Sequence, residues 1–239
     1  MPILEGEKVT KYFGGLAAVA NVDFQVNQGE IVGLIGPNGA GKTTLFNLVS
    51  GTFAPTSGII RLKGENITRL KPHQICKRGV ARTFQAGNLF PKMTVLENVL
   101  LGALFGCSTR IHAADAQQEA RELLELVGLS EKKGVMARDL TFAAQKRLEL
   151  ARALATKPEL LLLDEVMAGL NPTEVAQSLE LIRKIQSRGI TVFLVEHVMK
   201  AIMDISERII VLHHGEKIAE GTPEEIATSK TVIKIYLGE

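Results

Sequence analysis

The sequence predicts an α/β fold in which a helical segment interrupts a core of mostly parallel strands. Apolar runs at residues 30–35, 160–163, 190–195 and 209–212 have the length and composition of buried strands. Residues 172–188 carry a helical pattern between two of these runs, and a strand–helix–strand unit of this kind makes its strands parallel. Residues 94–154 show helical periodicity, so we expect this segment to be the insert.

Shorter patterns predict the remaining elements. Alternating or β-branched stretches predict short strands at residues 8–10, 22–26 and 59–62. Apolar spacing and the stop signals Gly128 and Pro158 predict helices at residues 95–104, 113–127 and 140–155. We therefore expect a single domain over residues 1–239. Its core would comprise residues 1–85 and 158–239, and its helical subdomain residues 86–157.

Composition excludes several classes of protein. With 46% hydrophobic and 23% charged residues in 239, the chain has the make-up of a folded domain with a large core. A net charge of +2, dispersed along the chain, does not favour a nucleic-acid binder. No apolar run approaches the roughly 20 residues of a membrane span, so we expect a chain that cannot cross a bilayer by itself. Cys76 and Cys107 lack metal-ligand spacing, and we expect them to be reduced thiols in the cytosol.

The most specific motif follows the first apolar strand. Residues 36–43 fit G-x-x-x-x-G-K-[ST], the phosphate-binding loop, and a predicted helix closed by Gly51 comes next. Glycines let the backbone approach phosphate oxygens, and the N–H groups at the helix start point toward them. Lys42 is expected to reach the β- and γ-phosphates, and the Thr43 hydroxyl to coordinate Mg²⁺. The predicted phosphate-binding residues are Gly36, Pro37, Asn38, Gly39, Ala40, Gly41, Lys42 and Thr43.

Two carboxylates end the apolar strand at residues 160–163. Ligands of open α/β sheets bind at the carboxyl ends of the strands, so Asp164 and Glu165 are expected to face the phosphates. Asp164 would hold Mg²⁺ directly or through water, as a Walker-B aspartate does. Glu165 would polarise the attacking water. A solvated acidic pair at a strand end is the alternative, and the phosphate loop weakens it.

Three further residues are candidates for the same site. His197 follows the strand at 190–195 and is expected to donate to a γ-phosphate oxygen. Gln85 lies where the core passes into the insert and is a candidate ligand of Mg²⁺ or water, with an ordinary surface glutamine as the alternative. Phe13 precedes a Gly-Gly turn and is either an adenine-stacking ring or a core residue. The other histidines have no comparable placement and are expected at the surface or in turns: His73, His112, His213 and His214.

Taken in order, these motifs resemble those of ABC-type ATPases over essentially the whole chain. The matching segments are residues 36–44, Gln85, residues 140–154, residues 160–165 and His197. Within that superfamily, the chain is similar to ATP-binding subunits of branched-chain amino-acid importers at residues 14–19, 81–85, 166–173 and 236–239. The resemblance implies a P-loop NTPase core of mostly parallel strands, an antiparallel β subdomain and an inserted helical subdomain.

The resemblance also implies an ATPase that works on the cytoplasmic face of the inner membrane as a peripheral subunit of an importer. ATP and Mg²⁺ are its expected cofactors, and Thr44 joins the nucleotide-binding residues. Phe13 would stack on adenine, Gln85 would sense the γ-phosphate, and His197 would be the switch histidine. The loop with Leu89, Phe90 and Met93 would meet a short helix of a transmembrane permease subunit. A substrate-binding protein is an indirect partner.

The chain departs from the family pattern in the signature stretch that contacts ATP held by the other protomer. That stretch is usually Leu-Ser-x-Gly-Gln, whereas residues 140–144 are Leu-Thr-Phe-Ala-Ala. Thr141 keeps a hydroxyl for the nucleotide, but Ala143 places a Cβ where glycine lets the backbone approach phosphate. In the loop after the catalytic glutamate, Asn171 replaces the aspartate that is usual in the family. Each composite site takes its signature from the partner, so a homodimer would carry the altered signature in both sites. We therefore expect a heterodimer with a homologous ATPase subunit, with a homodimer as the alternative.

Other functions stay open at this point. The transported substrate is expected to be a branched-chain amino acid, with urea, short amides or a lipid component as alternatives. The altered signature also permits a regulatory nucleotide-binding module that hydrolyses little ATP. A soluble ABC ATPase acting on DNA or ribosomes is disfavoured because the chain has one ATPase unit, no coiled-coil arm and no basic stripe.

Overall fold

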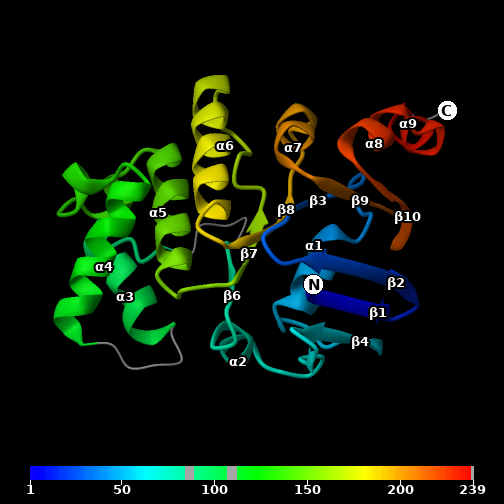
Figure 1. The fold of residues 1–239 in the computed structure, drawn as a ribbon, viewed down its shortest axis with the longest axis horizontal. Helices are drawn as coiled ribbons and strands as arrows, with labels where there is room; N and C mark the ends of the chain where they lie inside the picture. The colour runs from blue at the N-terminus through cyan, green and yellow to red at the C-terminus, as the bar shows by residue number, and fades with distance from the viewer. Residues whose placement is uncertain (84–88, 107–111, 238–239) are drawn as a thin grey trace.

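A twisted, mostly parallel sheet forms the centre of the computed structural model, which describes residues 1–83, 89–106 and 112–237 (Figure 1). Within these residues the sheet has six strands in the order β10-β9-β3-β8-β7-β6. Neighbouring strands are parallel except for β10, which is antiparallel to β9. The strands are β3 (Ile31–Ile35), β6 (Val80–Arg82), β7 (Leu160–Asp164), β8 (Thr191–Val195), β9 (Arg208–His213) and β10 (Glu216–Gly221).

A second, antiparallel sheet lies beside the first and confirms the expected β subdomain. Its order is β2-β1-β4-β5, with bounds β1 (Pro2–Phe13), β2 (Leu16–Asn27), β4 (Ser57–Leu62) and β5 (Glu65–Asn66). The prediction of short strands at 8–10 and 22–26 is wrong in length, because β1 and β2 have 12 residues each. Positive φ at Lys8 and Asn21 and shifts of register break the alternation of side chains, which hid the length of both strands.

The insert forms a helical lobe at one end of the central sheet, in green in Figure 1. Its helices are α3 (Val95–Phe105), α4 (Ala113–Leu126) and α5 (Phe142–Leu154), and the expected bounds agree to within one or two residues. Short 3₁₀ turns at Ser130–Lys132 and Ala137–Asp139 join α4 to α5. Gln85 and Cys107 lie outside the described residues, so the predictions for them are not addressed by the structure.

Further helices cover the sheet. They are α1 (Lys42–Val49), α2 (Pro72–Cys76), α6 (Pro172–Gln186), α7 (Met199–Ile205), α8 (Pro223–Thr228) and α9 (Lys230–Leu237). α6 begins with Pro172 at its first turn, and Asn171 and Glu174 form a reciprocal capping box. Among the described residues, no helix combines the length and apolarity that crossing a membrane requires.

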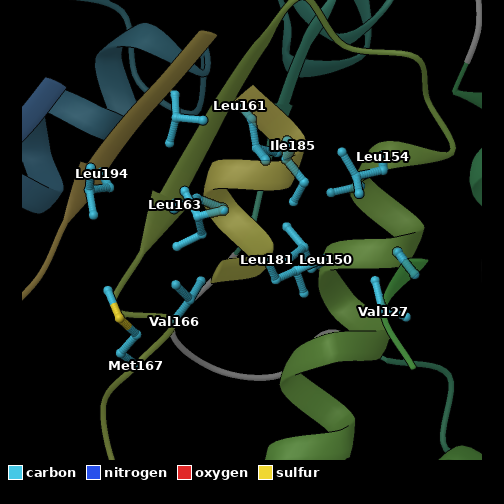
Figure 2. Close-up of a cluster of buried hydrophobic side chains, with 14 of the residues drawn as sticks. Val127, Leu150, Leu154, Leu161, Leu163, Val166, Met167, Leu181, Ile185 and Leu194 are labelled. Atoms are coloured by element: carbon cyan, nitrogen blue, oxygen red, sulfur yellow. The ribbon is translucent and has the colours of Figure 1, made fainter. Parts of the chain in front are cut away.

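The core is organised around β7, whose residues are buried on both faces of the sheet. Leu161 and Leu163 pack with apolar side chains of α5 and α6, as Figure 2 shows. Leu160 and Leu162 pack on the opposite face, in a cluster that includes α1 and the antiparallel sheet. All four leucines are fully buried, which fixes the position of the carboxylates at the end of the strand.

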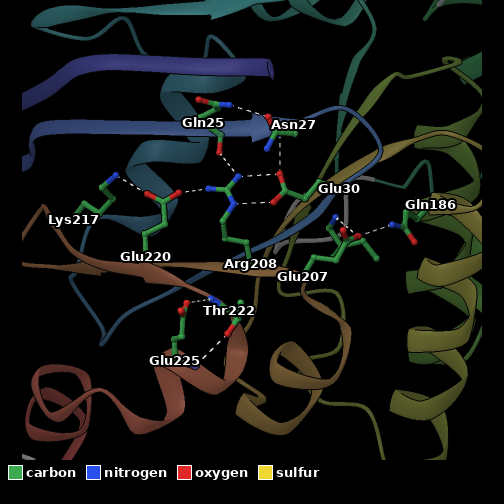
Figure 3. Close-up of polar contacts among 11 residues, drawn as sticks. Gln25, Asn27, Glu30, Gln186, Glu207, Arg208, Lys217, Glu220, Thr222 and Glu225 are labelled. Carbon is green, nitrogen blue, oxygen red and sulfur yellow. Dashed lines mark hydrogen bonds and ion pairs between the residues drawn. The ribbon is translucent and has the colours of Figure 1, made fainter. Parts of the chain in front are cut away.

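A polar cluster joins the two sheets at the amino ends of β3 and β9 (Figure 3). Arg208 donates from Nε and Nη2 to the two carboxylate oxygens of Glu30, at 2.8 and 2.9 Å, and also contacts Glu220. Arg208 Nη2 further donates to the Gln25 carbonyl oxygen of β2 at 2.8 Å. Burial alone would raise the pKa of Glu30, but the bonds and charge of Arg208 hold that pKa below its ordinary value.

Candidate nucleotide-binding site

The loop between β3 and α1 has a backbone that only glycine fits at two positions. Gly36 and Gly41 have φ of 154° and 102°. A Cβ on Gly36 would lie 2.2 Å from the Leu212 carbonyl oxygen, and one on Gly41 would lie 2.4 Å from that of Ala18. The loop and its neighbouring strands are therefore packed so closely that these two glycines are required by the geometry as well as for access to a ligand.

Lys42 is the first residue of α1, and its side chain curls back over the loop. Its Nζ donates to the carbonyl oxygens of Gly36 and Pro37 at 2.6 and 3.0 Å. Burial lowers the pKa of Lys42, and the nearby charges of Glu165 and Asp164 oppose that effect. The ammonium is thus held at the loop where it is expected to meet phosphate oxygens.

Asp164 is buried beside the loop and has one carboxylate oxygen free for another ligand. Its Oδ2 accepts a hydrogen bond from Arg82 Nη2 at 2.7 Å. Its Oδ1 is buried and has no hydrogen-bond partner among the described residues. Oxygen is the ligand that Mg²⁺ prefers, so this carboxylate and the Thr43 hydroxyl fit the expected magnesium site.

Arg82 is a residue of this site that the sequence reasoning missed. Besides Asp164, its guanidinium donates to Asn47 Oδ1 at 2.7 Å and to Ser50 Oγ at 2.9 Å, both in or next to α1. It therefore links the phosphate-loop helix to the aspartate. The available signal was a single arginine in an otherwise apolar stretch, residues 80–82, which pairs with the strand that ends in Asp164.

Glu165 and His197 lie side by side at the ends of neighbouring strands. Glu165 Oε1 and His197 Nε2 are 2.7 Å apart. Both line a cavity of about 450 Å³ together with residues 38–44 of the phosphate loop and residues 16–18 of β2. The structure thus brings together Glu165, His197 and most of the predicted phosphate-binding residues. Their catalytic and binding roles stay predictions.

Phe13 and Thr141 occupy positions outside that lining. Phe13 is the last residue of β1, and its ring lies edge-on to that of Phe53, with the ring centroids 5.4 Å apart. The Lys11 ammonium lies 5.2 Å from the centroid of the Phe13 ring. Thr141 caps α5, and its Oγ1 accepts from the Ala144 N–H at 3.4 Å. Adenine stacking by Phe13 and contact of Thr141 with a partner's nucleotide stay predictions.

His214 is an exposed turn residue, as expected, but it also lines the same cavity, so the expectation that its placement is not comparable to that of His197 is wrong. It lies in the turn after β9 with φ of 48°. The next residue, Gly215, donates its N–H to the Ala40 carbonyl oxygen at 3.0 Å, which ties this turn to the phosphate loop. The strand-end rule that placed His197 applies equally here, since β9 is parallel to β3 and adjacent to it.

A larger cavity of about 570 Å³ lies between the core and the helical lobe, lined by residues of α2, β6, α3 and α5. Phe90 is at this cavity, and the Arg152 guanidinium lies 5.7 Å from the centroid of its ring. Glu149 of α5 also lines it and is 5% exposed, and burial raises the pKa of this carboxyl. A hydrophobic groove is one kind of surface on which proteins bind an amphipathic helix of a partner.

Comparison with known proteins agrees with this geometry. Residues 19–168 match the model of the ABC transporter family, and residues 216–239 match that of the branched-chain amino acid ATP-binding cassette transporter. The chain is 44% identical to the high-affinity branched-chain amino acid transport ATP-binding protein BraF of Pseudomonas aeruginosa, with 100% of this chain and 98% of BraF covered. It is 43% identical to LivG of Escherichia coli and 35% identical to the lipopolysaccharide export system ATP-binding protein LptB of Haemophilus influenzae, each at the same coverage.

Solved structures are similar over the full length as well. A nucleotide-free ATP-binding cassette from an ABC transporter superimposes with a TM-score of 0.91 at 30% identity, with 100% of both chains covered. The ADP conformation of MJ1267, another ATP-binding cassette, gives 0.91 at 31% identity with the same coverage. The dimeric post-hydrolysis state of the cassette MJ0796, bound to ADP and phosphate, gives 0.83 at 29% identity, covering 92% of this chain and 98% of the other.

Proposed function

The chain belongs to the ABC transporter family as an ATP-binding, ATP-hydrolysing cassette, and on this premise we propose that it energises a membrane importer of branched-chain amino acids. The observation that carries this proposal is identity of 43–44% over the full chain to BraF and LivG, whose names specify that transport. The match of residues 216–239 to the model of the branched-chain amino acid ATP-binding cassette transporter also supports it.

The geometry suggests how the residues share the work of hydrolysis. Residues 36–44 would hold the phosphates of ATP through backbone N–H groups and the Lys42 ammonium. Thr43 and Asp164 would hold Mg²⁺, which neutralises phosphate charge when bound. Glu165 would orient and polarise the attacking water, and the 2.7 Å contact with His197 would keep its carboxylate at the cavity.

The partners follow from the same family assignment. ATP-binding subunits of ABC transporters dimerise and act with transmembrane permeases. We propose that the groove with Phe90, Glu149 and Arg152 receives a permease segment on the cytoplasmic face of the inner membrane. A substrate-binding protein would act on the other face. The altered signature at residues 140–144 favours a homologous second ATPase subunit as the dimer partner.

Reconstitution in proteoliposomes tests the proposal. The chain, its permease subunits and a second ATPase subunit should drive ATP-dependent uptake of leucine or isoleucine and not of urea, short amides or lipid. Uptake of a lipid in place of the amino acids would favour the alternative suggested by the similarity to LptB. Lack of ATP-driven uptake of any of these substrates would contradict the transport assignment.

Glu165→Gln separates a working ATPase from a regulatory module. Removing the carboxylate should abolish turnover and trap ATP in a closed dimer, because binding is kept and water activation is lost. Turnover measured by phosphate release and dimerisation measured by size exclusion with ATP would report both. A module that hydrolyses little would be almost unaffected by the substitution.

A further inference from the structure

The backbone turn that carries Glu165 is unusual. Glu165 has φ of 53°, in the left-handed region, where a residue with a Cβ is disfavoured. Such a conformation persists only when the surrounding structure holds it. One anchor is a main-chain bond from the Glu165 N–H to the Val195 carbonyl oxygen at 2.9 Å.

A second anchor comes from the side chain of the next residue on the same strand end. Glu196 follows β8 and is 2% exposed. Its Oε1 accepts a hydrogen bond from the Met167 N–H at 2.7 Å, two residues beyond Glu165. Two consecutive residues therefore hold the turn on either side of Val166. Val195, the last residue of β8, does so through its carbonyl oxygen, and Glu196 through its carboxyl group.

The surroundings of Glu196 give it an unusual titration. The pKa of Glu196 is raised to about 7, mainly by burial and to a smaller extent by the charge of Glu165. The Met167 and His197 N–H groups and the charge of Lys146 on α5 act in the opposite direction. Its Oε2 is buried with no hydrogen-bond partner among the described residues. Neither oxygen lines the nucleotide cavity, so this carboxyl group has no direct contact to offer ATP.

We propose that Glu196 is a positioning residue for ATP hydrolysis, whose side chain fixes the left-handed turn and so aims Glu165 at the attacking water. The inference rests on the proposed role of Glu165 as the group that polarises that water. The required property is an acceptor for the Met167 N–H. Glutamine keeps such an acceptor without the charge, and leucine has none.

Two substitutions in the full chain, assembled with its partner subunits, test this. Glu196→Leu should lower kcat by about tenfold or more while the Kd for ATP changes by less than about twofold, because only the aim of Glu165 is lost. Glu196→Gln should keep kcat within about threefold of the parent. Ionisation of Glu196 strengthens the acceptor, so the kcat of the parent should rise by no more than about threefold between pH 6 and 8, and Glu196→Gln should lack that rise.

Thr191→Val is the matched control at the other end of β8. Thr191 is fully buried, and its Oγ1 accepts the Gly29 N–H at 2.9 Å, so the substitution also removes a buried side-chain acceptor from a backbone donor. It should lower stability without lowering kcat. Hydrogen exchange of the Met167 amide should accelerate by about tenfold in Glu196→Leu and stay unchanged in Thr191→Val.

Several outcomes would overturn the proposal. One is an unchanged kcat in Glu196→Leu, and another is a kcat in Glu196→Gln as low as in the leucine variant. If Glu196→Leu fails to fold, a pH profile of Glu196→Gln identical to that of the parent decides against the proposal. Retained turnover in Glu165→Gln would remove the premise that Glu165 polarises the attacking water. If the transporter carries another substrate than a branched-chain amino acid, these ATPase measurements are unaffected.

Discussion

At the scale of single residues, the phosphate loop combines positions that tolerate a side chain with positions that do not. Gly41→Ala places a Cβ 2.4 Å from a carbonyl oxygen at φ of 102°, so we expect loss of ATP binding by at least about tenfold and a clear fall in melting temperature. Calorimetric titration with ATP and thermal unfolding would measure both.

Gly39→Ala is the control for that prediction. Gly39 also has positive φ, 80°, but a Cβ there would meet open space. The substitution should cost only the strain of a left-handed residue, about 1 kcal/mol. Equal losses of ATP binding and melting temperature in the two variants would contradict this. They would show that the positive φ, and not the close packing against β2, determines which positions of the loop need glycine.

Glu196 should also give the stability of the protein a specific pH dependence. Its ordinary pKa of 4.5 is raised to about 7 in the folded state. Between these values the folded protein keeps a proton that the unfolded chain releases, so the free energy of unfolding falls as pH rises. Glu196→Gln removes this contribution, and its stability relative to the parent should increase by about 3 kcal/mol between pH 4 and pH 8. Urea unfolding of both proteins at several pH values would measure this difference. A difference in the free energy of unfolding that stays the same at every pH would contradict the prediction.

At the scale of elements, Asn98 connects α3 to the segment that precedes it. Asn98 is fully buried, and its side chain accepts from the Phe90 N–H at 2.9 Å and donates to the carbonyl oxygens of Phe90 and Thr94 at 3.1 and 3.0 Å. The amide therefore holds the chain beside the groove in a fixed conformation, which positions Phe90 for the proposed permease contact.

Asn98→Ala leaves these backbone groups without their partner. We expect a loss of about 2 to 3 kcal/mol in the free energy of unfolding, and weaker stimulation of turnover by the permease. Urea unfolding and ATPase assays in proteoliposomes would report the two effects. Gln118→Ala, which removes an exposed bond to Glu122 on α4, should change stability by less than about 0.5 kcal/mol.

At the scale of the whole molecule, Arg208 joins the two sheets. Arg208→Gln should lower stability by about 2 kcal/mol near neutral pH, because Glu30 is left partly buried without its counter-charge. The depressed pKa of Glu30 adds stability that is present above the unfolded pKa and is lost as pH falls through the folded pKa. The free energy of unfolding of Arg208→Gln should therefore fall less steeply than that of the parent as the pH is lowered. Arg138→Gln, at an exposed pair with Asp139, should have little effect.

The dimer is the largest scale on which the sequence makes a prediction. The lone chain should hydrolyse ATP slowly, because both sites of a homodimer carry the altered signature, and a homologous subunit should restore turnover. Ala143→Gly would let the backbone approach phosphate and should raise the turnover of the homodimer, at a helix cost of up to about 1 kcal/mol. Full activity of the unmodified lone chain would contradict the heterodimer.

The sequence by itself determined the phosphate loop, the acidic end of β7 and the main α/β elements. Each of these is a local pattern: a contiguous glycine motif, an apolar run followed by Asp164 and Glu165, or helical spacing closed by a stop signal. The placement of His197 near Glu165 also followed from a local rule, because both residues succeed parallel strands of one sheet.

Only the tertiary structure decided which distant side chains meet. Arg82 reaches Asp164 because β6 pairs with β7, and Glu196 reaches Met167 because β7 pairs with β8. His214 reaches the loop because β9 is adjacent to β3. Strand order and register set these contacts, and they depend on packing across the whole sheet, which no local stretch of sequence encodes.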